Sequence, residues 1–160
     1  MIRATLKVDL KRHKTLQGAI ATGTGPVKET LESFERLYRA FVLRRFDRFS
    51  RGGGNWKPNS DAVKRAKRSS AILVDSRVMR LGLNVGVRAT RITKNSVTFS
   101  FTNRARHPSA SLTIAQLATV HDQGNGVPKR QILVKPDAET TKRLLDMAKK
   151  KYLRWLNARD

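Results

Sequence analysis

The sequence predicts an α+β fold: a long N-terminal helix and a C-terminal helix packed on a small, mainly antiparallel sheet, with a short central helix. Apolar residues recur at helical spacing over residues 26–50 and again over 137–156, and they alternate with polar residues between 83 and 103. The length of 160 residues suits one α+β domain, residues 26–160, after a flexible N-terminal arm, residues 1–25.

The predicted arm contains few apolar residues among Lys and Arg, and its stretch 18–25 is small and rich in glycine. Two interpretations stay open: a disordered tail, or an arm that orders on a neighbouring subunit. Pro26 suits the first turn of the long helix, with Thr24 as its cap, and the glycines at 52–54 end it.

The middle of the chain predicts a basic connection, a short helix and a hairpin. Residues 51–70 form a basic loop or short helix, and residues 77–81 form the central helix, which Gly82 stops. Alternating residues 83–88 and 97–102 then form strands joined by a turn at 94–95. Their single apolar face predicts a sheet that packs on the long helices.

The last third of the chain predicts two helices around a short strand. A helix from Ile114 stops at the breaker 124–126, and residues 131–134 form the strand. Asp137 caps the final helix, whose apolar face continues to Leu156.

Charge is the most prominent feature, because 34 Lys and Arg oppose 12 Asp and Glu and give a net charge of +22. Such a surface attracts polyanions: nucleic acid, acidic protein faces or anionic membranes. No apolar run approaches the roughly 20 residues of a membrane span. The absence of cysteine excludes disulfides and thiolate metal sites. We therefore expect a protein made in the cytoplasm, without a membrane partner.

No catalytic motif stands out in the sequence. His13, His107 and His121 lie in the arm, a loop and a helix end, and no HExxH, Walker A or GxSxG motif is present. A two-metal nuclease needs clustered carboxylates. The candidate acids are instead dispersed, at Asp61, Asp75, Asp122 and Asp137. We expect no enzymatic activity, no cofactor and no metal, with a nuclease left as a third alternative that folding would have to assemble.

Two features admit both a functional and a structural interpretation. The pair His121–Asp122 is either a dyad or metal ligand, or a helix-terminal imidazole favoured by the helix dipole. Trp56, near Lys64 and Arg65, is either a platform on which a base stacks or a loop tryptophan that plugs the core. We favour the structural interpretation of both, since neither further ligands nor further aromatic residues accompany them.

Three blocks of sequence carry a resemblance. Residues 55–60 read N-W-K-P-N-S, residues 72–80 read I-L-V-D-S-R-V-M-R, and residues 118–124 and 127–133 read A-T-V-H-D-Q-G and V-P-K-R-Q-I-L. They resemble, in order and spacing, the blocks W-x-P-x-S/T, L-x-x-T/S-G-x-L-x-x-S and A-x-I-H-Q/E-x-G … I-P-A-R-P-F-L of phage virion morphogenesis proteins, also called tail-completion proteins. Ser76-Arg77 stands where Thr-Gly is usual, Lys129 where Ala is usual, and Gln131-Ile132 where Pro-Phe is usual.

The resemblance implies a non-enzymatic structural virion protein at the head–tail junction (neck, collar or tail completion), made in the host cytoplasm. Related proteins form rings around the channel that DNA traverses. It implies a homo-oligomer, hexameric or dodecameric, with a portal-side adaptor and tail-tube or tail-terminator proteins as partners, and DNA passing through the ring. The alternative from another class is a sequence-nonspecific nucleic-acid-binding protein, which the charge favours.

Two groups of residues follow from the blocks and the charge. The rigid Val127-Pro128 pair is expected to present basic residues to a partner. The expected subunit or partner contacts are Trp56, Pro58, His121, Gly124, Pro128, Lys129 and Arg130. The expected contacts with channel DNA or an acidic partner are Lys64, Arg65, Lys67, Arg68, Arg104 and Arg106.

Overall fold

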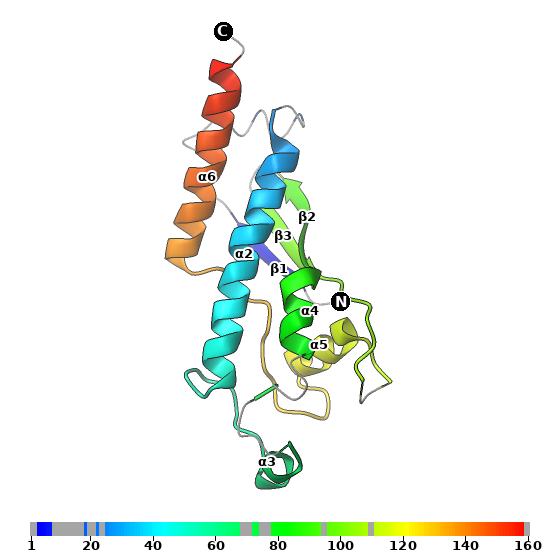
Figure 1. Cartoon of the computed structure of the whole chain (residues 1–160). Coiled ribbons are helices and arrows are strands. Elements are labelled where there is room, and N and C mark those ends of the chain that lie inside the picture. Colours follow the sequence, from blue (N-terminus) through cyan, green and yellow to red (C-terminus); the bar gives the residue numbers. More distant parts are fainter. Residues whose placement is uncertain are drawn as a thin grey trace.

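A computed structural model describes residues 3–7, 18, 22, 25–67, 72–73, 78–93, 96–108 and 111–158. The elements are β1 (Arg3–Lys7), α2 (Val27–Ser50), α3 (Asp61–Lys67), α4 (Val78–Gly86), β2 (Val87–Thr93), β3 (Ser96–Phe101), α5 (Ile114–Gln123) and α6 (Ala138–Asn157). The long helices α2 and α6 lie side by side, and α2 also borders α4 and the sheet (Figure 1). The predicted α+β fold is therefore confirmed.

The sheet has three antiparallel strands in the order β1-β3-β2. In β1, Arg3 lies opposite Ser100 and Lys7 opposite Ser96. Residues 3–7 therefore belong to the domain, and the prediction that they form part of a flexible arm is wrong. The free edge of β3 offers backbone partners that a short, charge-rich segment can use without a strong apolar pattern of its own. Apart from residues 18, 22 and 25, the rest of the predicted arm lies outside the described residues.

The strand expected at 83–88 starts later, because residues up to Gly86 belong to α4. Met79, Gly82, Leu83 and Gly86 are buried, whereas Val85 is 56% exposed. Burial thus follows the helical period, which the four residues 83–86 are too few to separate from strand alternation. Gly82 does not stop the helix; a Cβ at this position would lie 2.8 Å from Ile114, so the glycine lets α4 approach α5 closely.

The hairpin of β2 and β3 agrees with the second predicted strand. Thr93 pairs with Ser96 next to the expected turn, whose residues 94–95 lie outside the described part of the chain. A bulge interrupts the register between Ala89 and Arg91.

The core lies between α2 and the sheet. The ring of Tyr38 stacks on that of Phe99 with 3.9 Å between centroids, and both side chains are fully buried. Glu35 fastens α2 to β2, since its carboxylate accepts the Ala89 N–H at 3.0 Å and pairs with Arg88 at 3.3 Å. The helix face thereby fixes the position of the hairpin.

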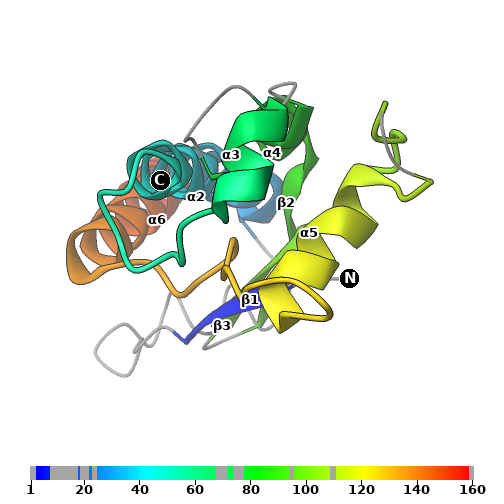
Figure 2. The same cartoon turned by 90° about the horizontal axis from the view of Figure 1, so that it is seen from below.

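The C-terminal end of α5 and the N-terminal end of α6 are set by residues next to them in the chain, as predicted. Gly124 ends α5 in the left-handed conformation with φ 81°. Asp137 caps α6 by accepting the Thr140 N–H at 2.7 Å. Seen from below, α2 and α6 form one flank and α5 the other (Figure 2). Among the described residues, none of the helices is both long enough and apolar enough for a membrane span.

Candidate functional site

An extended segment, residues 130–137, runs between α5 and α6 and passes along α2 (Figure 1). The prediction of a strand at 131–134 is wrong, because the backbone groups of these residues form hydrogen bonds with side chains and not with another strand. The Tyr38 hydroxyl donates to the Val134 carbonyl at 2.8 Å, and the Arg45 guanidinium donates to the Gln131 carbonyl. The Ile132 N–H donates to the Asp122 carboxylate at 3.3 Å. The segment is thus held by α2 on one side and α5 on the other.

Arg130 anchors the start of this segment. Its N–H donates to the His121 carbonyl at 2.7 Å, and its guanidinium donates to the Lys57 carbonyl at 3.0 Å and to the Asn59 amide oxygen at 3.2 Å. The residue is only 4% exposed, and burial lowers the pKa of its guanidinium. We call this meeting of residues 56–59, 121–124 and 130–134 the loop junction. Arg130 was expected to face a partner beside Lys129, but it is committed to holding the loop junction together.

Trp56 plugs the core beside the loop junction. It is 5% exposed, and its ring meets those of Phe46 and Phe49 edge-on at 5.6 and 5.5 Å between centroids. The Arg45 guanidinium lies over the rings of Phe49 and Trp56. The structural interpretation of Trp56 is therefore confirmed, and a buried ring can neither stack on a base nor touch a partner directly.

The pair His121–Asp122 also has structural neighbours. His121 is half-buried, and its carbonyl serves Arg130. Burial raises the pKa of Asp122, while the hydrogen bond from Ile132 and the charges of Lys129 and Arg45 act in the opposite direction. Within the described residues, no group of three or more His, Asp or Glu side chains is arranged to hold a metal ion.

The other expected partner contacts lie at or near the surface. Pro58 and Lys129 are exposed, and Pro128 is half-buried. A Cβ on Gly124 would lie 3.1 Å from the Cβ of Lys129, so the positive φ and the close approach both favour glycine there.

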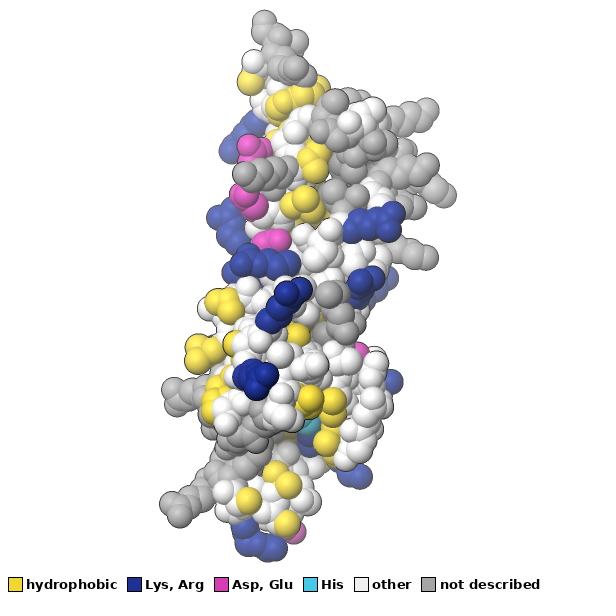
Figure 3. Space-filling view, turned by 90° about the vertical axis from the view of Figure 1, so that its right-hand side faces the viewer, with side chains coloured by type: hydrophobic (Ala, Val, Ile, Leu, Met, Phe, Trp, Pro, Cys, Tyr) yellow, Lys and Arg dark blue, Asp and Glu magenta, His cyan; other side chains and the backbone are white. Residues whose placement is uncertain are grey.

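The expected DNA or acidic-partner contacts do not converge on one site. Lys64, on α3, pairs with Asp61 at 2.9 Å, and Arg65 is exposed. Arg104 and Arg106 are exposed on the segment that follows β3. This segment runs along a different part of the molecule from α3 (Figure 1). The Lys67 side chain and the whole of Arg68 lie outside what the structure describes. Figure 3 shows Lys and Arg spread along the face in view, on which most of the visible acidic side chains lie in the upper half.

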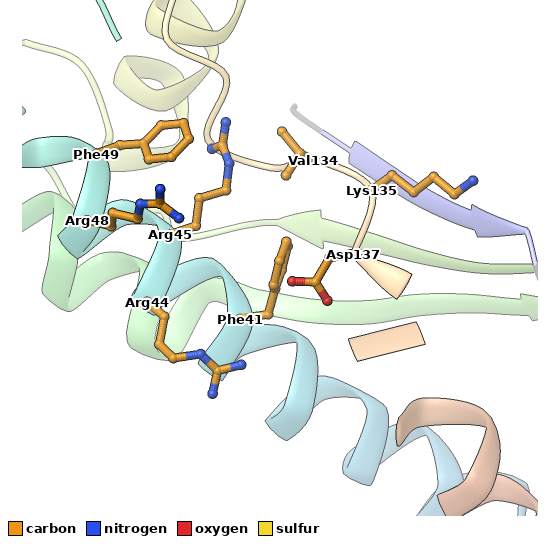
Figure 4. Close-up of a pocket in the computed structure, with 8 residues that line it drawn as sticks. All are labelled: Phe41, Arg44, Arg45, Arg48, Phe49, Val134, Lys135 and Asp137. Atoms are coloured by element: carbon orange, nitrogen blue, oxygen red, sulfur yellow. The ribbon is translucent and has the colours of Figure 1, made fainter. Parts of the chain in front are cut away.

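A groove beside α2 gathers cations that we had not predicted as a site. Its α2 wall consists of Phe41, Arg44, Arg45, Arg48 and Phe49 (Figure 4). Its other wall consists of Val134, Lys135 and Asp137, and the groove encloses about 430 Å³. We call it the arginine groove. Arg48 follows Arg44 by four residues and Arg45 by three, so it lies beside each of them on the helix, but only the extended segment turns this side of α2 into the wall of a concave surface.

The charges in the arginine groove are unequally placed. Burial lowers the pKa of Arg45, which lies inward over the aromatic rings. The hydrogen bond from Thr140 lowers the pKa of the Asp137 carboxyl, and the charge of Arg44 acts in the same direction. The groove therefore holds one carboxylate against four cationic side chains.

Comparison of the chain with protein-family models, with curated proteins and with solved structures found no match.

Proposed function

We propose that this chain is a structural virion protein of a tailed phage, which assembles as a ring at the head–tail junction and joins the tail to the head around the DNA channel. It contributes binding surfaces rather than chemistry. Its partners are further copies of itself and acidic faces of the adjoining adaptor and tail-tube or tail-terminator proteins.

The observation that carries this proposal is the loop junction. Two of the three blocks that resemble phage virion morphogenesis proteins meet there, since Arg130 of one block donates to the Lys57 carbonyl of the other, 73 positions away. Blocks that pack against each other form one structural unit, as residues that maintain a common fold do. This contact supports the resemblance beyond the order of short motifs.

The surface charge supports the proposed assembly with acidic partners. A heterologous contact joins two different patches of neighbouring subunits and closes into a ring when the rotation allows it. With a net charge of +22, identical subunits repel one another unless anions or acidic partners lie between them. We therefore expect assembly to depend on an acidic partner or on DNA, and to weaken as salt concentration rises.

A phage carrying an early stop codon in this gene tests the proposal. Electron microscopy of the lysate should show separated full heads and finished tails, and the wild-type chain supplied in trans should restore joined particles. Normal joined particles in the absence of the chain would refute the proposed role.

Sequence-nonspecific binding to nucleic acid is the second candidate, favoured by the exposed cations Arg65, Arg104 and Arg106. A monomer or dimer that retards short duplex DNA would show a logarithmic salt slope of about 0.9 per phosphate contact. Light scattering on the same samples separates the two candidates, because only a ring protein should reach a fixed higher oligomer with its virion partners.

A further inference from the structure

The cationic side chains of the arginine groove differ in how many contacts they make within the protein. Arg45 is held by the Gln131 carbonyl and lies 4.2 Å above the centre of the Phe49 ring. Arg48 donates to the Gly53 carbonyl at 2.7 Å. Arg44 and Lys135 are exposed on opposite walls, and neither makes a hydrogen bond or ion pair with any described residue. These two side chains remain available to a ligand.

The surface of the groove between Arg44 and Lys135 is apolar. Phe41 is buried and Val134 is half-buried, and both line the groove from opposite sides (Figure 4). Phe49 also lines it, but Arg45 covers one face of that ring and Trp56 meets it edge-on. The groove therefore offers an apolar contact surface flanked by charge, in which the Phe49 ring is already covered on one face by Arg45.

The dimensions of the groove restrict its occupant further. Its volume of about 430 Å³ falls in the usual range for small-ligand pockets. Duplex DNA is a wide cylinder that contacts ridges of exposed cations through its phosphates. A concave site of this size suits one or two side chains of a polypeptide.

We propose that the arginine groove binds an acidic polypeptide segment of a partner protein in which Asp or Glu residues flank an apolar side chain. The apolar side chain packs on Phe41 and Val134, and the carboxylates pair with Arg44 and Lys135. Asp137 sets the spacing, because its own carboxylate repels an acid placed directly over the start of α6. This inference rests on the proposed function, to which it adds the chemistry of the partner.

Fluorescence anisotropy with the purified full chain tests the groove. The probe is a labelled peptide in which glutamates flank a leucine and a phenylalanine. The double variant Arg44→Ala with Lys135→Ala should bind it about tenfold more weakly than the wild type, as expected for the loss of two exposed charge pairs. The matched control, Lys149→Ala with Lys150→Ala, removes the same charge from exposed positions of α6 and should bind like the wild type.

Further probes complete the test. A peptide with glutamine for glutamate and one with serine for the apolar residues should both bind more weakly than the original. Single-stranded and duplex DNA should lose affinity equally for both double variants, since they sense net charge. Absent peptide binding, equal loss of peptide binding in both variants, or DNA binding lost only in the groove variant would each overturn the inference.

The outcomes for the groove and for the proposed function are separable. Thermal unfolding of both double variants should match the wild type, which excludes misfolding as the cause of weak binding. If the peptide result fails while the stop-codon phage still yields separated heads and tails, the groove assignment falls and the junction role stands. If joined particles form without the chain, the junction role falls whatever the peptide result.

Discussion

Replacing Arg130 by methionine separates a residue that supports the fold from one that contacts a partner. Methionine fills a similar volume and removes the three hydrogen bonds that the guanidinium donates: two to the Lys57 carbonyl, at 3.0 and 3.4 Å, and one to the Asn59 side chain, at 3.2 Å. If Arg130 were a surface contact, as its sequence position suggested, folding stability would not change. Because it is buried, we expect a substantial loss.

The magnitude follows from the hydrogen bonds. Bonds from a charged donor contribute about 1.5–3 kcal/mol, and each buried acceptor left unsatisfied costs about 1–3 kcal/mol. Relief from burying a charge offsets part of this loss. We expect a net destabilisation of about 2–3 kcal/mol, which for a domain of this size lowers Tm by about 5–10 °C.

Urea unfolding followed by circular dichroism measures the effect. The midpoint should fall in Arg130→Met with little change in the slope. Lys129→Met is the matched control, because Lys129 precedes Arg130 and its exposed side chain makes no hydrogen bond with any residue that the structure describes. The stability of this variant should stay within about 0.5 kcal/mol of that of the wild type. A midpoint for Arg130→Met equal to that of Lys129→Met would refute the structural role of Arg130.

Three further changes test other contacts. Tyr38→Phe removes the hydroxyl that holds the extended segment and should cost about 1 kcal/mol in urea unfolding; an unchanged midpoint would mean that this bond adds nothing. Gly86→Ala would place a Cβ 2.5 Å from the Phe101 ring, so Tm should fall by an amount equivalent to about 1–3 kcal/mol. Gly52→Ala is the comparison, because a Cβ at this exposed turn would meet no atom within 4 Å, so its loss of stability reports the cost of the positive φ alone. Asp137→Ala should cost about 1 kcal/mol at pH 7. The pKa of Asp137 is lowered in the fold by its bond from Thr140, so this contribution is present above the unfolded pKa and is lost as pH falls through the folded one. The gap between variant and wild type should therefore shrink below about pH 4, and a gap that stays constant down to pH 2 would contradict the cap.

Features with a local cause could be predicted from sequence. The cap at Asp137 and the stop at Gly124 depend on groups within a few residues, and both are present. The stripe of α2 repeats over many turns, so its period is unambiguous. The segment 83–86 was misassigned because four residues fit both periods, and packing of Met79 and Leu83 in the core decided for a helix.

Features that depend on distant segments could not be predicted in this way. Strand β1 is short and charged, and it exists because β3 has an edge to pair with. Residues 131–134 have the composition of a strand, yet Tyr38, Arg45 and Asp122 provide their backbone partners. Neither pairing leaves a signal within its own segment.

The class of fold, the excess of positive charge, the stop of α5 at Gly124 and the start of α6 at Asp137 could all be predicted, because they depend on composition and on neighbours along the chain. Which cations are exposed depends instead on contacts between distant segments. The tertiary structure buried Arg130 against Lys57 and left Arg44 open opposite Lys135. An arginine is the same residue in the sequence whether water or a distant carbonyl solvates its side chain, and only the folded chain brings that carbonyl close.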